Sequence, residues 1–208
     1  MNAFIYVGGE VFPDGIPDFP KKGDIVISAD CGYENAKKLG VEVDFAVGDF
    51  DSGVKAQIPR DVEIIEVPAE KDFTDTQLAV DLAIEQGAEL IYIIGGLSGR
   101  LDHTMSNLGI IEKLWTLGKR AVICDGKNRV RYISRTSELV VKNSFKYLSL
   151  ITADETAKGV SLDGCKYPLK KAKLTRTNNA FTTSNEIVKN CALVSVKKGG
   201  LYIIESND

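Results

Sequence analysis

Carboxylates that follow short apolar runs are the residues of this sequence best suited to chemistry. Asp30 follows the run 25–28, and Asp49 and Asp51 follow the run 45–47. Asp49 and Asp51 are two residues apart, so on an extended segment their side chains point to the same side. Mg²⁺ takes oxygen ligands and is usually held by one or two carboxylates together with substrate phosphates. The pair indicates a magnesium site, and a surface turn of Gly, Asp and Ser is the alternative for these residues alone.

A second acidic cluster follows the apolar run 64–67 and contains Asp72 and Asp75. Asp75 falls in the first turn of a predicted helix, where the helix dipole favours negative charge whatever the function. The free N–H groups of a helix N-terminus already attract anions, so carboxylates there fit a cation that bridges them to phosphate. We therefore expect this cluster to belong to a metal-bound phosphate site.

A glycine-rich segment, 95–99, joins an apolar run to a second predicted helix and precedes Arg100, Asp102 and His103. It matches neither a Walker motif nor G-x-G-x-x-G, so neither a P-loop kinase nor a dinucleotide-binding fold follows from it. Its main-chain N–H groups and Arg100 could contact phosphate, although Arg100 alone could equally be an ordinary surface residue. Asp102 is expected to be the N-cap of the helix. His103 is the only histidine, which excludes a multi-histidine metal site and favours a structural or substrate-positioning role.

Composition describes an ordinary globular protein of 208 residues, with 44% hydrophobic residues, 26% charged residues and a formal net charge of -3. Such a chain is long enough for one large domain or two small ones. The balance of charge gives no reason to expect a nucleic-acid partner. The cysteines are widely separated and form no C-x-x-C pair, so we expect buried free thiols in place of a zinc or redox site.

Neither a signal peptide nor a membrane span is predicted. The N-terminal segment lacks a basic flank followed by a continuous apolar stretch, and no run approaches eighteen apolar residues. We therefore expect a cytoplasmic protein without a membrane partner.

The hydrophobic periodicity predicts two domains of different class. Up to residue 125, short apolar runs alternate with helical spacing, most clearly at 74–86 and 102–117, which is typical of βα units. After residue 126, short β-prone runs follow one another without intervening helices, which predicts a small antiparallel sandwich. We expect an α/β/α domain with a mostly parallel sheet over 1–125, followed by an antiparallel β-sandwich domain over 126–208. Ligands of parallel α/β sheets bind beyond the carboxyl ends of the strands, where the acidic and glycine clusters fall.

The motifs together resemble the thiamine pyrophosphokinase family. The strings ADCGYENAKKLGVEVDFAVGDFDS, EKDFTDTQLAV and GGLSGRLDHTMSNLGII carry the resemblance with high specificity, and TTSNE near the C-terminus carries it more weakly. The resemblance implies a catalytic α/β domain, a thiamine-binding sandwich domain and a homodimer whose active sites lie between domains of different subunits. It implies transfer of an intact diphosphate from ATP to the hydroxyl of thiamine, which gives thiamine diphosphate and AMP.

The same resemblance suggests roles for the acidic residues. Asp49 and Asp51 of GDFDS and Asp75 of DFTD would hold Mg²⁺ and the triphosphate. Asp72 and Asp30 would lie near the same centre, and Asp72 is one candidate to accept the proton of the thiamine hydroxyl.

Further roles are implied for both ends of the chain. Arg100 and the amides of its loop would contact ATP, while Asp102 and His103 would organise that loop or the attacking hydroxyl, with Asp102 a second candidate base. Ser184 and Asn185 would reach the pyrimidine of thiamine, and a hairpin turn is the alternative for them on turn chemistry alone.

Two other functions remain open on the residues alone. A metal-dependent phosphohydrolase could use the same carboxylates with water as the acceptor. A nucleotide-sensing module could bind the same ligands without turnover. Product analysis separates all three, because only the kinase makes AMP and a diphosphorylated acceptor.

Overall fold

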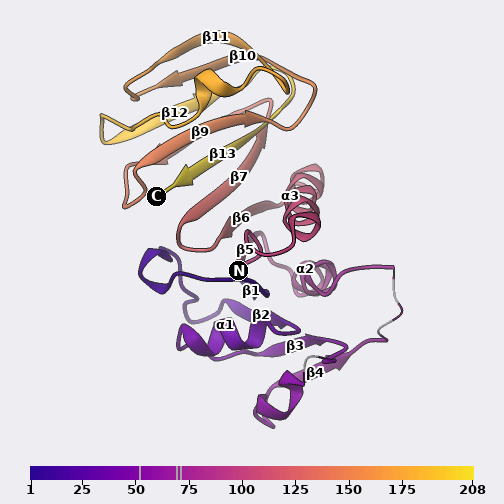
Figure 1. Cartoon of the computed structure of the whole chain (residues 1–208). Coiled ribbons are helices and arrows are strands. Elements are labelled where there is room, and N and C mark those ends of the chain that lie inside the picture. The colour runs from indigo at the N-terminus through magenta and orange to yellow at the C-terminus, as the bar shows by residue number, and fades with distance from the viewer. Residues whose placement is uncertain (52, 69, 71) are drawn as a thin grey trace. The chain divides into compact units, whose positions relative to one another are not determined.

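The computed structural model describes residues 1–51, 53–68, 70 and 72–208, which form two compact units. The first unit is Met1–Gly126 and the second unit is Lys127–Asp208. Figure 1 shows helices and strands in the first unit, whereas the second is built mainly of strands.

The first unit contains a parallel sheet whose strands run in the order β4-β3-β2-β1-β5-β6. Each neighbouring pair in this order is parallel. The central strands are continuously apolar because a parallel sheet is covered on both faces. The strands are β1 (Asn2–Tyr6), β2 (Ile25–Ala29), β3 (Phe45–Gly48), β4 (Glu63–Glu66), β5 (Leu90–Ile94) and β6 (Arg120–Cys124).

The order of the strands reverses between β1 and β5. From β1 the chain adds β2, β3 and β4 on one side and then crosses to add β5 and β6 on the other. Loops on the two sides of such a reversal diverge, and the crevice between them at the carboxyl ends is where ligands of open α/β sheets bind. The topology alone therefore places a candidate site beyond the ends of β1, β2 and β5.

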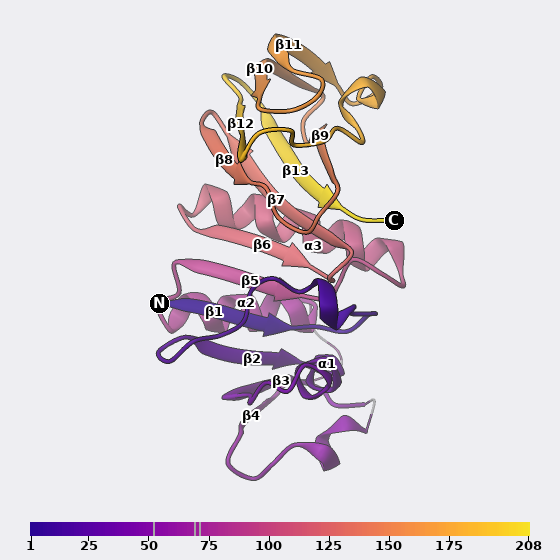
Figure 2. The same cartoon turned by 90° about the vertical axis from the view of Figure 1, so that its left-hand side faces the viewer.

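Helices cover both faces of this sheet. Helix α1 (Gly32–Lys38) lies on one face, and α2 (Asp75–Glu85) and α3 (Leu101–Thr116) lie on the other (Figures 1 and 2). The α2 helix begins as predicted, because the side chain of Thr74 accepts a hydrogen bond from the Gln77 amide at 3.2 Å. These observations confirm the predicted α/β/α class of the N-terminal part.

The start of α3 corrects one expectation. Arg100, not Asp102, is the N-cap residue, and its side chain makes no capping hydrogen bond. Asp102 lies inside the first turn, where its carboxylate accepts from the amide of His103 at 3.0 Å. Asp102 still places negative charge at the helix N-terminus, which the helix dipole favours.

The second unit contains two antiparallel sheets, in the orders β7-β13-β9 and β11-β10-β12-β8. Alternate residues of their strands are buried, which gives an apolar core typical of a sandwich and confirms the predicted class. The strands are β7 (Asn128–Ser134), β8 (Ser137–Val141), β9 (Tyr147–Thr152), β10 (Thr156–Asp163), β11 (Leu169–Thr175), β12 (Cys191–Ser195) and β13 (Gly200–Ser206).

A buried ion-pair network crosses the first of these sheets. The carboxylate of Glu205, which is 2% exposed, lies 2.6 Å from Arg131 and 3.6 Å from Arg129. Asn143 donates to the other carboxylate oxygen at 2.7 Å, and Arg131 also pairs with Glu138 at 3.2 Å. Because both oxygens of Glu205 are paired, its buried charge is compensated.

Candidate active site

Three carboxylates meet at the ends of β2 and β3. Oxygen atoms of Asp30, Asp49 and Asp51 all lie within 4.8 Å of one another. Asp30 follows β2 directly, and the other two follow β3, which pairs with β2 in parallel register. The sequence predicted Asp49 and Asp51 in this position with Asp30 near the same centre, and the structure places all three side by side. We refer to these three residues as the acidic cluster.

Unusual backbone conformations hold the acidic cluster in place. Asp30 has φ 43° and Phe50 has φ 56°, both in the left-handed region that non-glycine residues seldom adopt. Phe50 is nevertheless buried, with 6% of the residue exposed, so its burial helps to fix this conformation. Such strain persists where the surrounding structure fixes it, and it is frequent at functional sites.

Gly48 allows the two strand ends to approach. A Cβ atom at this position would lie 3.2 Å from both Cα and Cβ of Asp30. Asp51 folds back in the same loop, since its amide donates to the carboxylate of Asp49 at 3.2 Å. A side chain at residue 48 would therefore require Asp30 or the loop to shift, and glycine allows the approach without a shift.

The donor set of the acidic cluster suits a hard divalent cation. Three carboxylates so close together repel one another, and a bound cation removes that repulsion. Oxygen ligands of this kind match Mg²⁺, Mn²⁺ or Ca²⁺ better than a softer metal. The residues present therefore fit the magnesium ion that the sequence predicts.

A cavity of about 370 Å³ opens beside the acidic cluster, at the reversal of strand order. Asp30 lines it from the end of β2, and Asp75 lines it from the first turn of α2. Asp75 thus shares the cavity with Asp30, while the acidic cluster itself is made of Asp30, Asp49 and Asp51. Asp72 is exposed in the segment before α2 and is not part of the cavity wall.

Arg100 and His103 reach the same cavity from the start of α3. The guanidinium of Arg100 makes two hydrogen bonds to the carboxylate of Asp102, at 3.1 and 2.5 Å, and both side chains are exposed. The hydrogen bond from Arg100 holds the pKa of Asp102 below its usual value. A carboxylate with a lowered pKa is a weaker base, so in this structure Asp102 is better suited to orienting Arg100 than to accepting a proton.

Two glycine turns face each other across the strand reversal. The turn after β1, formed by Val7, Gly8 and Gly9, is tied to the segment after β5 by a bond from the Gly96 amide to the Gly8 carbonyl at 3.0 Å. The buried side chain of Asn107 on α3 donates to the Gly96 carbonyl at 3.0 Å. We call residues 7–9 the first glycine turn and residues 95–99 the second glycine turn.

Sequence reasoning found the second glycine turn and missed the first. Gly8 and Gly9 follow the apolar run that became β1, so the rule that located the other clusters applied to them as well. Asn35 and Asn107, which support the turns, gave no comparable signal because they lie within helices and act through contacts distant in sequence.

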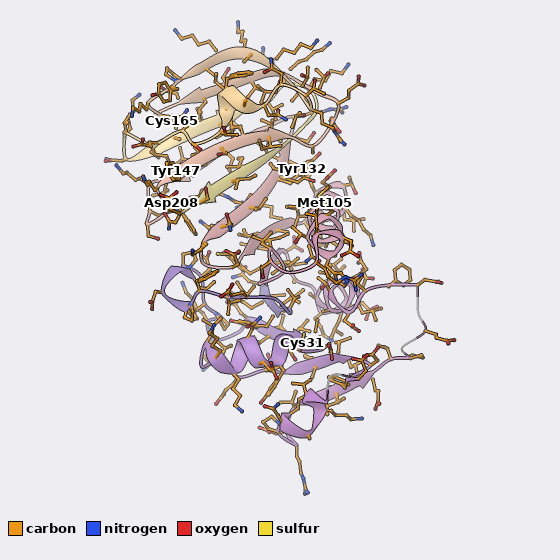
Figure 3. The ribbon with its side chains drawn as sticks, in the orientation of Figure 1. Cys31, Met105, Tyr132, Tyr147, Cys165 and Asp208 are labelled. Atoms are coloured by element: carbon orange, nitrogen blue, oxygen red, sulfur yellow. The ribbon has the colours of Figure 1, made fainter. Side chains whose placement is uncertain are left out.

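Cysteine 31 lies directly after Asp30, at the start of α1, and lines the cavity (Figure 3). Burial, together with the charge of Asp30, raises the pKa of its thiol, which keeps the thiol protonated. All four cysteines are free, as expected, but only Cys124 and Cys165 are buried, whereas Cys31 and Cys191 are partly exposed.

Two domain models of one protein family match this sequence in order. The model described as thiamin pyrophosphokinase, catalytic domain, matches residues 17–124. The model described as thiamin pyrophosphokinase, vitamin B1 binding domain, matches residues 136–201. The chain belongs to the thiamin pyrophosphokinase family.

Members of this family resemble the chain over two thirds or more of its length. A thiamine pyrophosphokinase of Bacillus subtilis (strain 168) is 30% identical over 212 residues, which cover 98% of each chain. Thiamin pyrophosphokinase 1 of Caenorhabditis elegans is 28% identical over 68% of this chain and 64% of its own. The crystal structure of a B. subtilis thiamine pyrophosphokinase covers 100% of both chains with a TM-score of 0.89 and 27% identity. That of a Geobacillus thermodenitrificans thiamin pyrophosphokinase covers 100% of this chain and 98% of its own, with a TM-score of 0.85 and 29% identity.

Ser184 and Asn185 fall within the part of the chain that matches the vitamin B1 binding domain of thiamin pyrophosphokinases. Asn185 is buried, and its side chain bonds both the carbonyl and the amide of Tyr167, at 2.7 and 3.1 Å. Ser184 is exposed, has φ 56°, and its amide donates to the hydroxyl of Ser149 at 2.9 Å. Asn185 therefore connects its own segment to the segment that contains Tyr167. Of the two predicted residues, Ser184 is the one whose side chain faces solvent.

Among the residues that the structure describes, no helix combines the length and apolar character needed to cross a membrane.

Proposed function

We propose that this member of the thiamin pyrophosphokinase family transfers the diphosphate of ATP to the hydroxyl of thiamine, giving thiamine diphosphate and AMP. The hydroxyl oxygen attacks the β-phosphorus, the bond from that phosphorus to the oxygen of the α-phosphate breaks, AMP leaves, and the hydroxyl proton is released. The observation that carries the proposal is the acidic cluster beside a glycine-lined cavity at the strand reversal, in a chain with matches to both the catalytic and the vitamin B1 binding domains.

The acidic residues are proposed to hold the metal and the triphosphate. Asp30, Asp49 and Asp51 would hold Mg²⁺, and Asp75 would approach the metal-bound phosphates from α2. When bound, the cation neutralises charge on the phosphate oxygens, which is the main requirement of phosphoryl transfer. Asp72 would lie at the rim and add negative charge that favours the cationic ring of thiamine. A strong nucleophile is not needed, because positioning and charge neutralisation supply most of the rate.

The residues of α3 are proposed to bind the nucleotide. Arg100, held in orientation by Asp102, offers a planar guanidinium that can contact a phosphate through two hydrogen bonds. His103 lies on the same wall of the cavity and would help to position a substrate. In the second glycine turn the amides of Gly95 and Gly96 already donate to main-chain carbonyls, so the amides of residues 97–99 would be the ones that contact a phosphate.

The second unit is proposed to bind thiamine. Ser184 would contact the pyrimidine, and Asn185 would hold the loop that presents it. The match of residues 136–201 to a vitamin B1 binding domain supports this assignment.

We also propose that the protein is a homodimer whose active sites combine residues of both subunits. The outer face of the β8–β12 pair supports this, since Leu139, Val141 and Leu193 are 55%, 62% and 48% exposed. Leu139 and Leu193 are cross-strand partners, and Val141 pairs with Cys191 on the same face. An exposed apolar patch on a sheet commonly marks a protein interface.

The dimer is tested by changing Leu139 and Leu193 together to Lys. Sedimentation should then show a monomer without diphosphate transfer, whereas Val188→Lys, which changes an exposed apolar residue outside the patch, should stay dimeric. An active monomer would disprove the shared site.

Product analysis tests the function itself. The protein is incubated with ATP, Mg²⁺ and thiamine, and the products are identified by mass. AMP and thiamine diphosphate in equal amounts are expected. Inorganic phosphate without a phosphorylated acceptor would indicate a phosphohydrolase, and nucleotide binding without any product would indicate a sensing module. The cytoplasmic location expected from the sequence stays a prediction.

A further inference from the structure

The first glycine turn forms part of the cavity wall, but none of the motifs gives it a role. One side chain holds both of its ends. The Nδ2 atom of Asn35 on α1 donates to the Val7 carbonyl at 2.7 Å and to the Gly9 carbonyl at 2.9 Å. The remaining carbonyl of the turn, that of Gly8, accepts from the Gly96 amide at 3.0 Å. Every carbonyl oxygen of the turn is therefore engaged by a donor from the protein.

The directions of these carbonyl groups fix the directions of the amides. In a trans peptide the C=O and N–H bonds point to opposite sides. The Gly9 carbonyl points to Asn35, and the amide of Glu10, on the other side of that peptide, donates to the Ser98 hydroxyl at 2.7 Å. Ser98 lines the cavity. By the same rule the Gly8 amide points away from Asn35, because the Val7 carbonyl points toward it, and the Gly9 amide points away from Gly96.

Side chains are excluded from this wall by its packing. A Cβ atom at Gly8 would lie 2.7 Å from Sγ of Cys31, and one at Gly9, where φ is 100°, would lie 2.9 Å from the hydroxyl of Ser98. A ligand in the cavity thus meets bare main chain at the turn. A main-chain amide that no side chain covers can donate a hydrogen bond to an anion.

We propose that the first glycine turn contacts the phosphate chain of the nucleotide through the main-chain amide of Gly8, and that Asn35 is the positioning residue that keeps the carbonyl oxygens of Val7 and Gly9 away from those phosphates. A carbonyl oxygen that rotated toward the cavity would repel a phosphate and would remove an amide at the same time. The inference rests on the proposed function, because that function makes a nucleotide the ligand of the cavity. Asn107 does the same for one carbonyl of the second glycine turn, so the two turns are built alike.

The experiment compares wild type with Asn35→Asp, which keeps the shape of the side chain but donates no hydrogen bond. Binding of α,β-methylene-ATP and of inorganic tripolyphosphate is measured by calorimetry in the presence of Mg²⁺, and KM and kcat are measured for both substrates. Both ligands should bind about 10-fold more weakly, the scale of one lost hydrogen bond to a charged group. KM for ATP should rise while KM for thiamine stays unchanged. Glu34→Gln, at an exposed neighbour on α1, should match wild type.

Each outcome decides the inference separately from the function. Unchanged tripolyphosphate binding in Asn35→Asp, or weakened binding of the nucleotide analogue alone, would show that Asn35 does not act on the phosphates, even if wild type makes thiamine diphosphate. If wild type binds both ligands but forms no product, the proposed function fails while the tripolyphosphate comparison still tests the turn. Should Asn35→Asp not fold, Asn35→Ala removes the same donors without adding charge and is read in the same way.

Discussion

The main-chain amide of Asp30 donates a hydrogen bond to the carbonyl of Val47 at 2.8 Å, so the end of β2 is joined to the end of β3 one residue before the GDFDS motif begins. This bond fixes the position of Asp30 along the sheet edge relative to the loop that carries Asp49 and Asp51. It explains why a residue 19 positions earlier in the sequence completes the acidic cluster. The cluster is thus a property of strand pairing as much as of its motif.

Removing one carboxylate of the acidic cluster should reduce turnover without unfolding the protein. Asp30→Asn, Asp49→Asn and Asp51→Asn are each expected to lower kcat by roughly 10² to 10³, the scale for loss of one electrostatic stabiliser. Their melting temperatures without metal should equal or exceed that of wild type, because three like charges repel one another. Added Mg²⁺ should raise the melting temperature of wild type more than that of any variant. Asp61→Asn, at an exposed position outside the cluster, serves as the control, and near-normal turnover in all three variants would remove them from the site.

A methyl group at Gly48 should disturb the acidic cluster, because it would push against the main chain of Asp30. Gly48→Ala places a Cβ 3.2 Å from Asp30, so either strand end must shift, and we expect lower turnover and lower stability. Gly109→Ala is the matched control, since nothing lies within 4 Å of its added Cβ and the residue is helical. That control should gain about 0.5–1 kcal/mol in free energy of unfolding. Chemical denaturation and assays at saturating Mg²⁺ report both effects, and equal behaviour of the two variants would refute the account of Gly48.

Substitution of Arg100 should weaken the binding of ATP and leave the binding of thiamine unchanged. Arg100→Ala is expected to raise KM for ATP, and Arg100→Lys should recover only part of the loss, because an ammonium cannot make the two parallel contacts of a guanidinium. Asp102→Asn should produce a smaller rise, since it frees Arg100 from its exposed partner. A rise in KM for thiamine alone would show that Arg100 contacts thiamine and not ATP.

The ion pair between Arg100 and Asp102 predicts that Asp102 contributes no pH dependence to kcat/KM for ATP near neutral pH. The pKa of Asp102 lies below its usual value, so the pair with Arg100 is intact above the ordinary Asp pKa of about 3.9 and is lost only as the pH falls through the lowered pKa. Between pH 5 and 8 the profile of kcat/KM for ATP should therefore have the same shape in wild type and in Asp102→Asn. A titration that disappears in the variant within this range would show that Asp102 acts as a base.

Substitutions of Ser184 and Asn185 should change different quantities, KM for thiamine in the first case and the free energy of unfolding in the second. Ser184→Ala is expected to raise KM for thiamine with little change in stability, because the side chain is exposed. Asn185→Ala removes two hydrogen bonds to partly buried main-chain groups of Tyr167 and should lower the free energy of unfolding by about 1–3 kcal/mol, at about 0.5–1.5 kcal/mol for each bond. Urea denaturation and substrate kinetics on both variants test this, and a stable Asn185→Ala protein with lost thiamine binding would place Asn185 in direct contact with substrate.

Parts of this structure could be predicted from sequence because their causes are local. Thr74 and Gln77 fix the start of α2 at the predicted place, since a cap and its partner are three residues apart. The positions of Asp49 and Asp51 followed from the rule that strand ends gather at one edge of a parallel sheet.

Other parts have causes that are distant in sequence. Strand β11 carries a weak sequence signal because lysines occupy its exposed positions, and its pairing with β10 shifts register near Val160, which breaks the alternation that indicates a strand. Asn35 acts on residues 26 and 28 positions away, and its helix periodicity carries no sign of that contact. The side-chain pairing of Asn185 with Tyr167 likewise depends on how two loops fold together.

The central place of β1 has a consequence for how the protein is made. Residues 2–6 leave the ribosome well before their partner β5, because they pair with β2 on one side and with β5, which ends at Ile94, on the other. Until β5 has been synthesised, one edge of β1 stays without its partner, and the crevice at the strand reversal has only one wall. Long-range parallel pairing of this kind slows folding because the loop must close before its contacts form. The binding site is therefore expected to be among the last features of the first unit to appear on a growing chain.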